Sequence, residues 1–243
     1  MAKAELINTL DAKSVFIAPD ESRVEAGRGA IQQEVERIIE AFITSLPDPK
    51  QLSAEKRRGI ISRYTAVLEG NFIYWMTGAY LAVASEDARS IILENLHEEV
   101  RDSHPAMLRR FAVAARSVPT DSDAADITPD LTNVRLFVGL LSGVHTVLML
   151  AFFEGLIQRF MPFLAELAAL QGSTEMEYTD VHGVCDIAHT EGLFCALVSE
   201  MVFNPSRYEA DLFEGVSLLH TLIRTIIDPV NAQNQQAACA LIS

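Results

Sequence analysis

Apolar residues recur at helical spacing along most of the chain. Between residues 26 and 45 they fall three or four positions apart, which places them on one face of a helix. The run of residues 46–49 contains two prolines and ends this helix, because proline has no backbone N–H to donate. The same spacing and similar turn residues predict further helices over about residues 53–84, 85–102, 105–117, 130–170, 175–203 and 210–227.

The fold class follows from this pattern. The alternation of apolar and polar residues that is typical of strands is missing, and no segment is repeated. We therefore predict an all-α protein built as a single bundle of about seven helices. With 243 residues, the chain is long enough to bury a large core. We place the helical domain at residues 26–228, after an N-terminal extension (residues 1–25) and before a polar C-terminal tail (residues 229–243).

One apolar segment tests whether the chain crosses a membrane. Residues 136–157 are mostly apolar and are long enough to span a bilayer. The segment contains Glu154, however, and an unpaired carboxylate is costly inside lipid. No other segment resembles it. We therefore predict a helix that runs through the middle of a bundle, and no membrane partner.

Composition and charge argue against other classes of protein. The net charge is −14, and no run of lysine and arginine is longer than residues 56–58, so nucleic acid is a poor partner. The three cysteines form no CxxC pair, which indicates free thiols in a reducing compartment. The first residues lack the basic start and apolar core of a signal peptide. We therefore expect a cytoplasmic protein.

The candidate chemistry lies in ionisable residues that the pattern places among apolar ones. Phosphate-binding glycine loops and nucleophile elbows are absent. Glu154 lies in an apolar run, where a buried carboxylate is costly unless it is paired or bound to metal. Glu69 lies in a second run of the same character. For both residues the structural alternative is a hydrogen bond or ion pair with a nearby polar side chain.

A histidine–aspartate–histidine triplet is the most specific of these signals. His182, Asp186 and His189 occupy positions i, i+4 and i+7, so they fall within about 60° of one another on a helix. Two imidazoles and a carboxylate on one face suit a metal ion. A solvated polar stripe is the alternative interpretation.

The segment of residues 94–104 can complete such a site. It contains several carboxylates and ends in His104 beside a helix break at Pro105. With the other stretches it supplies enough carboxylates and imidazoles for two metal ions that share a bridging carboxylate. A ferritin-like site would instead need two ExxH motifs, and only Glu94 with His97 fits that spacing.

The order of these motifs resembles that of the haem-oxygenase-like di-iron oxidases and oxygenases. The resemblance runs from about residue 60 to 195 and is carried by Glu69, by residues 94–99 with His104, by residues 153–157 around Glu154, and by the HxxxDxxH motif of residues 182–189. It implies the seven-helix fold of that family. Relatives with the same fold include the metal-free thiaminase-like proteins and the coenzyme-PQQ-synthesis proteins.

The resemblance also implies a set of metal ligands. It assigns Glu94 and His104 to one iron, Glu69, His182, Asp186 and His189 to the second iron, and Glu154 as the bridge between the two. Because the helix breaks before His104, helical spacing does not predict which carboxylate of that segment lies next to this histidine. Three other carboxylates could therefore take the place of Glu94: Glu98, Glu99 and Asp102.

The activity that the resemblance implies is oxidation with O2 as co-substrate. Two Fe(II) ions would react with O2 to form a peroxo-diferric species. An external electron donor is a possible further partner. Our first hypothesis is N-oxygenation of a small amine in a biosynthetic pathway. The second is oxidative C–C cleavage or decarboxylation of an amino or fatty acid. The third is a metal-free, thiaminase-like binder of small molecules. A homodimer is expected from the family.

Overall fold

The computed structural model describes residues 21–203 and 212–229 of the chain. Within these residues there are nine α-helices, one short 3-10 helix and no strand. The elements are α1 (Glu21–Thr44), the 3-10 helix η1 (Pro49–Gln51), α2 (Ala54–Leu68), α3 (Asn71–Ala82), α4 (Glu86–Arg101), α5 (His104–Ala114), α6 (Asp121–Gly139), α7 (Gly143–Leu170), α8 (Glu177–Phe203) and α9 (Glu214–Ile227). The predicted all-α class is confirmed. Most of the predicted N-terminal extension and C-terminal tail lies outside the described residues.

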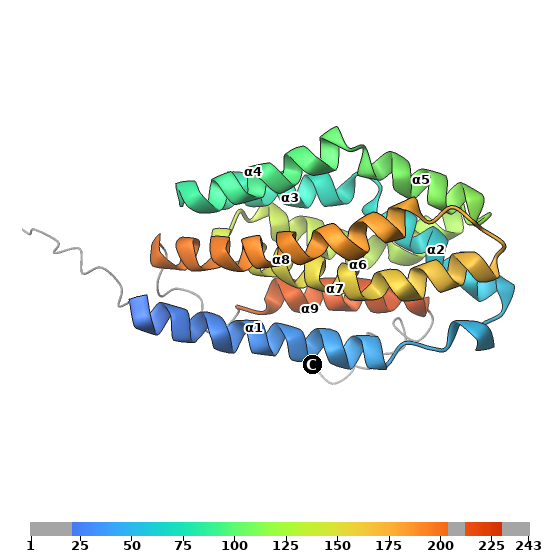
Figure 1. Ribbon diagram of the computed structural model, residues 1–243, viewed down its shortest axis with the longest axis horizontal. Helices are drawn as coiled ribbons and strands as arrows, with labels where there is room; N and C mark the ends of the chain where they lie inside the picture. Colours follow the sequence, from blue (N-terminus) through green and yellow to red (C-terminus); the bar gives the residue numbers. More distant parts are fainter. Residues whose placement is uncertain (1–20, 204–211, 230–243) are drawn as a thin grey trace, which may run out of the picture.

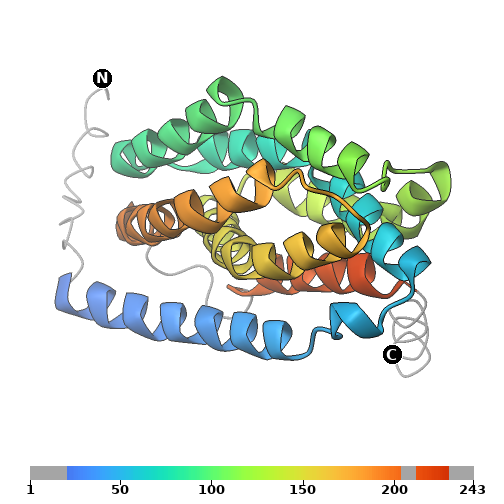
Figure 2. The same cartoon turned by 45° about the vertical axis from the view of Figure 1, so that its right-hand side comes forward.

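Helix α7 forms the centre of the bundle. Every residue from Gly143 to Ile157 is buried, and α7 packs extensively against α8 while also contacting α1, α2, α3 and α9. Figures 1 and 2 both show α8 between α1 on one side and α4 on the other. Each large apolar side chain buried in this way, such as Phe152, contributes about 1.5–3 kcal/mol to folding.

The burial of α7 explains its apolar composition. By length and composition the helix could cross a membrane, but 78% of its apolar window is buried inside the bundle. This is the pattern of a core helix in a soluble fold, as the sequence predicted. Its Glu154 is therefore a carboxylate in a protein interior, close to the side chains of other helices.

Two of the predicted helices are each divided in two. The segment predicted as one helix over residues 53–84 breaks between α2 and α3 at Gly70. Its φ of 85° lies in the left-handed region, which glycine adopts without a steric clash because it has no side chain. The segment predicted over residues 130–170 breaks between α6 and α7, where Leu141 has a φ of 53°. Apolar spacing does not predict these breaks, because apolar residues continue on both sides of each one.

Helix α6 begins well before its predicted start near residue 130. Thr120 and Asp123 form a capping box at this point: the hydroxyl of Thr120 accepts the backbone N–H of Asp123 at 3.3 Å, and the Asp123 carboxylate accepts the backbone N–H of Thr120 at 3.0 Å. These two bonds satisfy N–H groups that otherwise lack partners at a helix start. Pro129 then lies inside the helix rather than in a loop.

Candidate metal centre

Helices α4, α5, α7 and α8 bring ionisable side chains together in the interior. They are Glu99 on α4, His104 at the start of α5, Glu154 on α7, and His182, Asp186 and His189 on α8. We refer to these six residues as the carboxylate–histidine cluster. None of them is more than 6% exposed. Ionisable groups buried to this degree are costly to fold unless they are paired or bound to a cation.

Glu99, His104 and His182 form the first half of the cluster. Their ligand atoms lie within 4.8 Å of one another. His104 Nδ1 is 2.7 Å from Glu99 Oε1, and His182 Nε2 is 3.9 Å from the same oxygen. The break between α4 and α5 creates this contact, because Ser103 adopts a left-handed conformation with a φ of 59°. On an uninterrupted helix, residues five positions apart would point about 140° apart.

Asp186 and His189, together with Glu154, form the second half. His189 Nδ1 lies 3.8 Å from Glu154 Oε1 and 3.9 Å from Asp186 Oδ1. Cys185 borders this half, and its thiol donates to Asp186 Oδ1 at 3.1 Å. Glu154 also lines the same cavity as Glu99, so it connects the two halves of the cluster.

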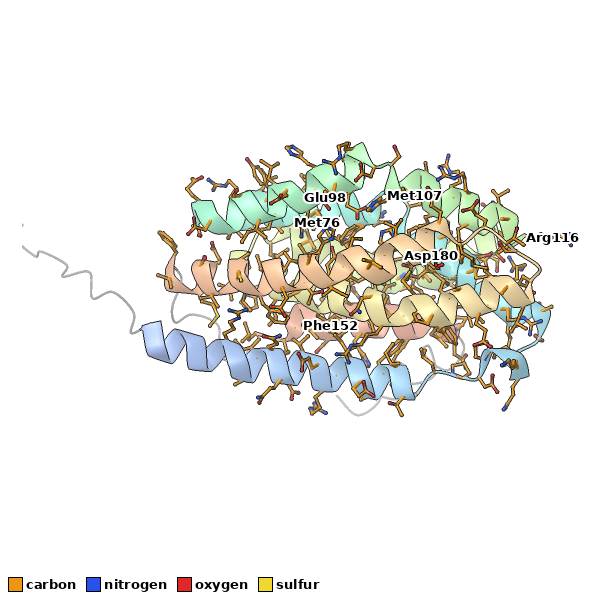
Figure 3. All side chains as sticks on the ribbon, in the orientation of Figure 1. Met76, Glu98, Met107, Arg116, Phe152 and Asp180 are labelled. Carbon is orange, nitrogen blue, oxygen red and sulfur yellow. The ribbon has the colours of Figure 1, made fainter. Side chains whose placement is uncertain are left out.

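Hydrogen bonds fix which nitrogen of two histidines carries the proton. A carbonyl or carboxylate oxygen only accepts, so His182 Nδ1–H donates to the backbone carbonyl of Tyr178 at 2.8 Å. In the same way His189 Nε2–H donates to Glu98 Oε2 at 2.9 Å. Figure 3 labels Glu98 on α4, close to the junction with α5. Both histidines therefore direct a bare nitrogen into the cluster, as metal-binding histidines do.

Three buried atoms of the cluster have no hydrogen-bond partner when the carboxylates are ionised. They are Glu154 Oε1, Asp186 Oδ2 and His189 Nδ1. All three carry lone pairs, and an unsatisfied buried acceptor costs roughly 1–3 kcal/mol. A cation bound among these atoms would satisfy all of them at once. The residues present therefore fit a metal ion.

Burial and mutual repulsion set the pKa values of the cluster. Burial raises the pKa of Glu154 well above its usual range, and the nearby charges of Asp186 and Glu99 raise it further. Burial also raises the pKa of Asp186 to about 8 and lowers the pKa of His182 to about 4. For His104, burial alone would lower the pKa, but the hydrogen bond and charge of Glu99 outweigh it and raise the pKa. A bound cation would favour the ionised carboxylates.

A small cavity lies beside the cluster. Its volume is about 20 Å³, which is enough for a metal ion or about one water molecule. Carboxylates and imidazoles of the cluster line one side of it, and the apolar side chains of Phe72, Leu108, Phe153 and Ile157 line the other. The rings of Phe72 and Phe153 pack with their centroids 5.2 Å apart. The apolar side restricts the access of water to the cluster.

Glu94 does not join the cluster, and this corrects the ligand set that the resemblance implied. Glu94 is exposed, whereas the buried face of α4 carries Asn95 and Glu99. Glu99 was one of the three alternatives, and the structure places it in the cluster beside His104. Asp102, another alternative, binds Arg101 at the surface. The direction in which each carboxylate points on α4 decides between them.

Glu69 also lies apart from the cluster. It caps the end of α2, is 32% exposed and forms an ion pair with Arg109 on α5. It borders a surface groove on α5, whereas the preceding residue, Leu68, lines the cavity beside the cluster. The chain turns at Gly70 directly after Glu69, which keeps this carboxylate at the end of α2. Of the seven ligands predicted by resemblance, the structure brings five together, and Glu99 joins them.

Glu98 and Cys185 have roles in the cluster that their sequence context does not predict. Glu98 was considered only as a metal ligand, but it binds the outer nitrogen of His189. Cys185 was considered only as a free thiol, although it precedes Asp186 directly and lies on the same broad face of α8. Helical phase alone would have placed Cys185 about 40° from His189. No local signal identifies Glu98, because its partner lies on another helix.

An all-α bundle with carboxylates and imidazoles facing one another across its core has the architecture of helical metalloproteins. A comparison with family models identifies the family: the model described as iron-containing redox enzyme, with a haem-oxygenase-like fold, matches residues 63–222. The match covers more than half of the chain and the whole cluster, so the protein belongs to this family of iron-containing redox enzymes. The family and fold predicted from the motifs are confirmed. Comparisons with curated proteins and with solved structures found no match.

Proposed function

We propose that the protein is a di-iron oxygenase that uses O2 to N-oxygenate a small amine. The observation that carries this proposal is the set of buried lone pairs without partners on Glu154, Asp186 and His189, within a family of iron-containing redox enzymes. Glu99, His104 and His182 would hold the first iron. Asp186 and His189 would hold the second, and Glu154 would bridge the two positions.

Charge supports two divalent ions rather than one. The buried carboxylates of Glu99, Glu154 and Asp186 and the partly exposed carboxylate of Glu98 lie around the histidines, and all four in ionised form would balance the charge of two Fe(II) ions. A single ion would leave part of this negative charge buried without compensation, which is costly. When bound, two Fe(II) ions supply electrons for the reduction of O2.

The residues around the cluster prepare the site for this chemistry. Glu98 and the Tyr178 carbonyl hold His189 and His182 with their bare nitrogens directed inward. Phe72 and Phe153 cover the cluster and exclude water, which protects reactive species from side reactions. The proton that Glu154 holds at high pKa must leave when a cation binds.

The cavity holds no more than a metal ion or one water molecule, so a substrate would enter only if the side chains around it move apart; their chemical character favours an amine over an acid. Among the described residues that line it there is no lysine or arginine to pair with a substrate carboxylate. A substrate carboxylate would therefore be repelled by the carboxylates of the cluster, whereas a protonated amine would be attracted to them. Apolar residues such as Leu108 and Ile157 would contact the hydrocarbon part of the substrate. The same apolar surface supports the second candidate, oxidative cleavage of a fatty or amino acid whose carboxylate binds iron.

The first test counts iron. Fe(II) is added without oxygen to the wild type and to Glu154→Ala and Glu154→Gln variants, and bound iron is measured after removal of the excess. We expect close to two irons per chain in the wild type and clearly fewer in both variants, with helical circular dichroism retained. Glu200→Gln is the matched control, because Glu200 is a buried glutamate on α8 that accepts the backbone N–H groups of Ala84 and Ser85 instead.

The second test adds O2 to the iron-loaded protein. We expect rapid O2 consumption and a transient visible absorbance, which candidate amines should discharge faster than candidate acids. The reverse order would favour C–C cleavage. A wild-type protein without stoichiometric iron or a transient would contradict the proposal and favour the metal-free binder. Unchanged iron in the Glu154 variants would contradict the bridging role.

A further inference from the structure

Cys185 borders the second half of the cluster but is not part of the ligand set proposed above. We infer that Cys185 is a thiolate ligand of the metal ion held by Asp186 and His189. The second metal position would then have sulfur, nitrogen and oxygen ligands, unlike the first. This inference rests on the proposed function, because it requires that position to bind metal.

Helical phase places the sulfur at the site. On a helix that turns 100° per residue, Cys185 and Asp186 fall on opposite sides of His189, about 40° and 60° away from it. Side chains on a helix lean toward its N-terminus, so the His189 imidazole leans over the space between the other two. As a result the Cys185 sulfur, an Asp186 oxygen and a His189 nitrogen lie within 4.8 Å of one another.

These separations are close to those of ligands on one ion. Donor atoms bound at about 2.0–2.3 Å lie roughly 3.3–3.8 Å apart at tetrahedral angles, so side-chain rotations must bring these atoms closer by up to about 1 Å. The thiol already approaches the carboxylate, since Sγ donates to Asp186 Oδ1 at 3.1 Å. A cation among these atoms would replace the S–H proton in that contact.

Unsatisfied neighbours provide a second, independent observation. Asp186 Oδ2 and His189 Nδ1 have no hydrogen-bond partner, and their residues are at least nine-tenths buried. Glu69, which the resemblance assigned to this position, pairs with Arg109 at the surface instead. Asp186, His189 and the bridging Glu154 would therefore supply three donors to this position, and Cys185 would supply a fourth.

The coordination step involves no redox change. The Cys185 thiol releases its proton to water as the sulfur–metal bond forms, and the metal keeps its oxidation state. Cys185 is only partly buried, so solvent can accept the proton and small reagents can reach the sulfur. The thiolate adds negative charge at the second position, which strengthens its hold on a divalent cation.

Cobalt(II) provides a direct test that does not depend on activity. Co(II) bound by a thiolate has a near-ultraviolet charge-transfer band that oxygen and nitrogen ligands do not produce. Co(II) is titrated anaerobically into the wild type and Cys185→Ser. The control is the double variant Cys195→Ser with Cys239→Ser, which keeps Cys185 as the one thiol in the chain. Cys195 is exposed on α8, and Cys239 lies outside the described residues.

We expect the band in the wild type and in the double variant, and its loss in Cys185→Ser. Alkylation of Cys185 should also slow at least tenfold when metal is bound. Bound cobalt without a charge-transfer band, or a band that survives in Cys185→Ser, would overturn the thiolate ligand and leave the proposed function standing. A wild-type protein that binds no cobalt and no iron would overturn both. If Cys185→Ser fails to fold, Cys185→Ala and the alkylation measurement on the wild type decide.

Discussion

At the scale of single residues, direction on a helix determines chemistry. Glu94, Glu98 and Glu99 are identical side chains within six residues of α4, yet they have three different environments. Glu94 faces solvent, Glu98 accepts a hydrogen bond from His189, and Glu99 is buried next to His104. Substitution of each one should therefore have a different effect on metal binding.

Glu99→Gln should remove a ligand of the first metal position. We expect bound iron to fall from about two ions to about one per chain, measured after anaerobic loading, because a neutral amide is a poor replacement for a carboxylate ligand. Glu94→Gln is the control on the same helix and should leave the iron content unchanged. Loss of iron in Glu94→Gln but not in Glu99→Gln would restore the ligand set that the resemblance implied.

Glu98 should act through His189 rather than on the metal. Its carboxylate fixes the tautomer and orientation of the imidazole, and loss of such a partner typically weakens metal affinity about 10–100-fold. We expect Glu98→Ala to show a decrease of this size in a Co(II) titration. Glu98→Gln should show a smaller one, because its amide oxygen still accepts the N–H. Equal affinity in wild type and Glu98→Ala would contradict the role of Glu98.

At the scale of the elements, the site depends on one helix break. Helix α4 ends at Arg101, Ser103 takes a left-handed conformation, and α5 starts at His104. This turn folds His104 back onto Glu99, which an uninterrupted helix would prevent. Figure 1 shows the break between α4 and α5 directly above α8, the helix that supplies the other histidines.

Substitutions of Ser103 test the importance of the break. Ser103 is exposed, so its replacement acts mainly through the backbone. Ser103→Gly should raise the free energy of unfolding by roughly 0.5–1 kcal/mol, because glycine adopts a φ of 59° without the penalty of an L side chain. Ser103→Val should lower it and should also reduce iron binding, since valine resists this conformation. Urea unfolding measures the first effect, and equal stability of the two variants would contradict it.

At the scale of the whole molecule, the buried ionisable groups of the cluster lower the free energy of unfolding when no metal is bound. Burial raises the pKa of Asp186 to about 8 and that of Glu154 well above its usual range. Ionising these groups inside the bundle opposes the packing of α7 against α8, the most central contact in the fold. The homodimer, the electron donor and the cytoplasmic location remain predictions at this scale.

The metal-free protein should lose stability as the pH rises. Because the pKa of Asp186 is higher in the folded state than in the unfolded state, the native state binds more protons between these two values. The contribution of Asp186 to the free energy of unfolding is therefore highest below about pH 4 and is lost as the pH rises to about 8. Asp186 alone contributes a slope of up to roughly 1.4 kcal/mol per pH unit. Urea unfolding of the metal-free wild type and of Asp186→Asn at several pH values measures the slope. A slope that Asp186→Asn leaves unchanged would contradict the assignment to Asp186.

The sequence by itself determined the helical class, the central apolar helix with its buried Glu154, and the face of α8 that carries His182, Asp186 and His189. These features are local: the period of a helix and the residues along it decide which side chains share a face. The breaks at Gly70 and Leu141 were not predicted, because apolar residues at helical spacing resume within two or three positions of each one and an isolated glycine is tolerated inside a helix.

Only the tertiary structure decided how the helices face one another. It selected Glu99 rather than Glu94, left Glu69 with Arg109, and paired Glu98 with His189. On α4 the buried face carries Ala88, Ile92, Asn95 and Glu99, so packing against the other helices decides which carboxylate is buried. The left-handed conformation of Ser103 then folds His104 back onto Glu99. Spacing along the chain does not show how separate helices face one another, so the residues that meet in the cluster became clear only when the helices were packed.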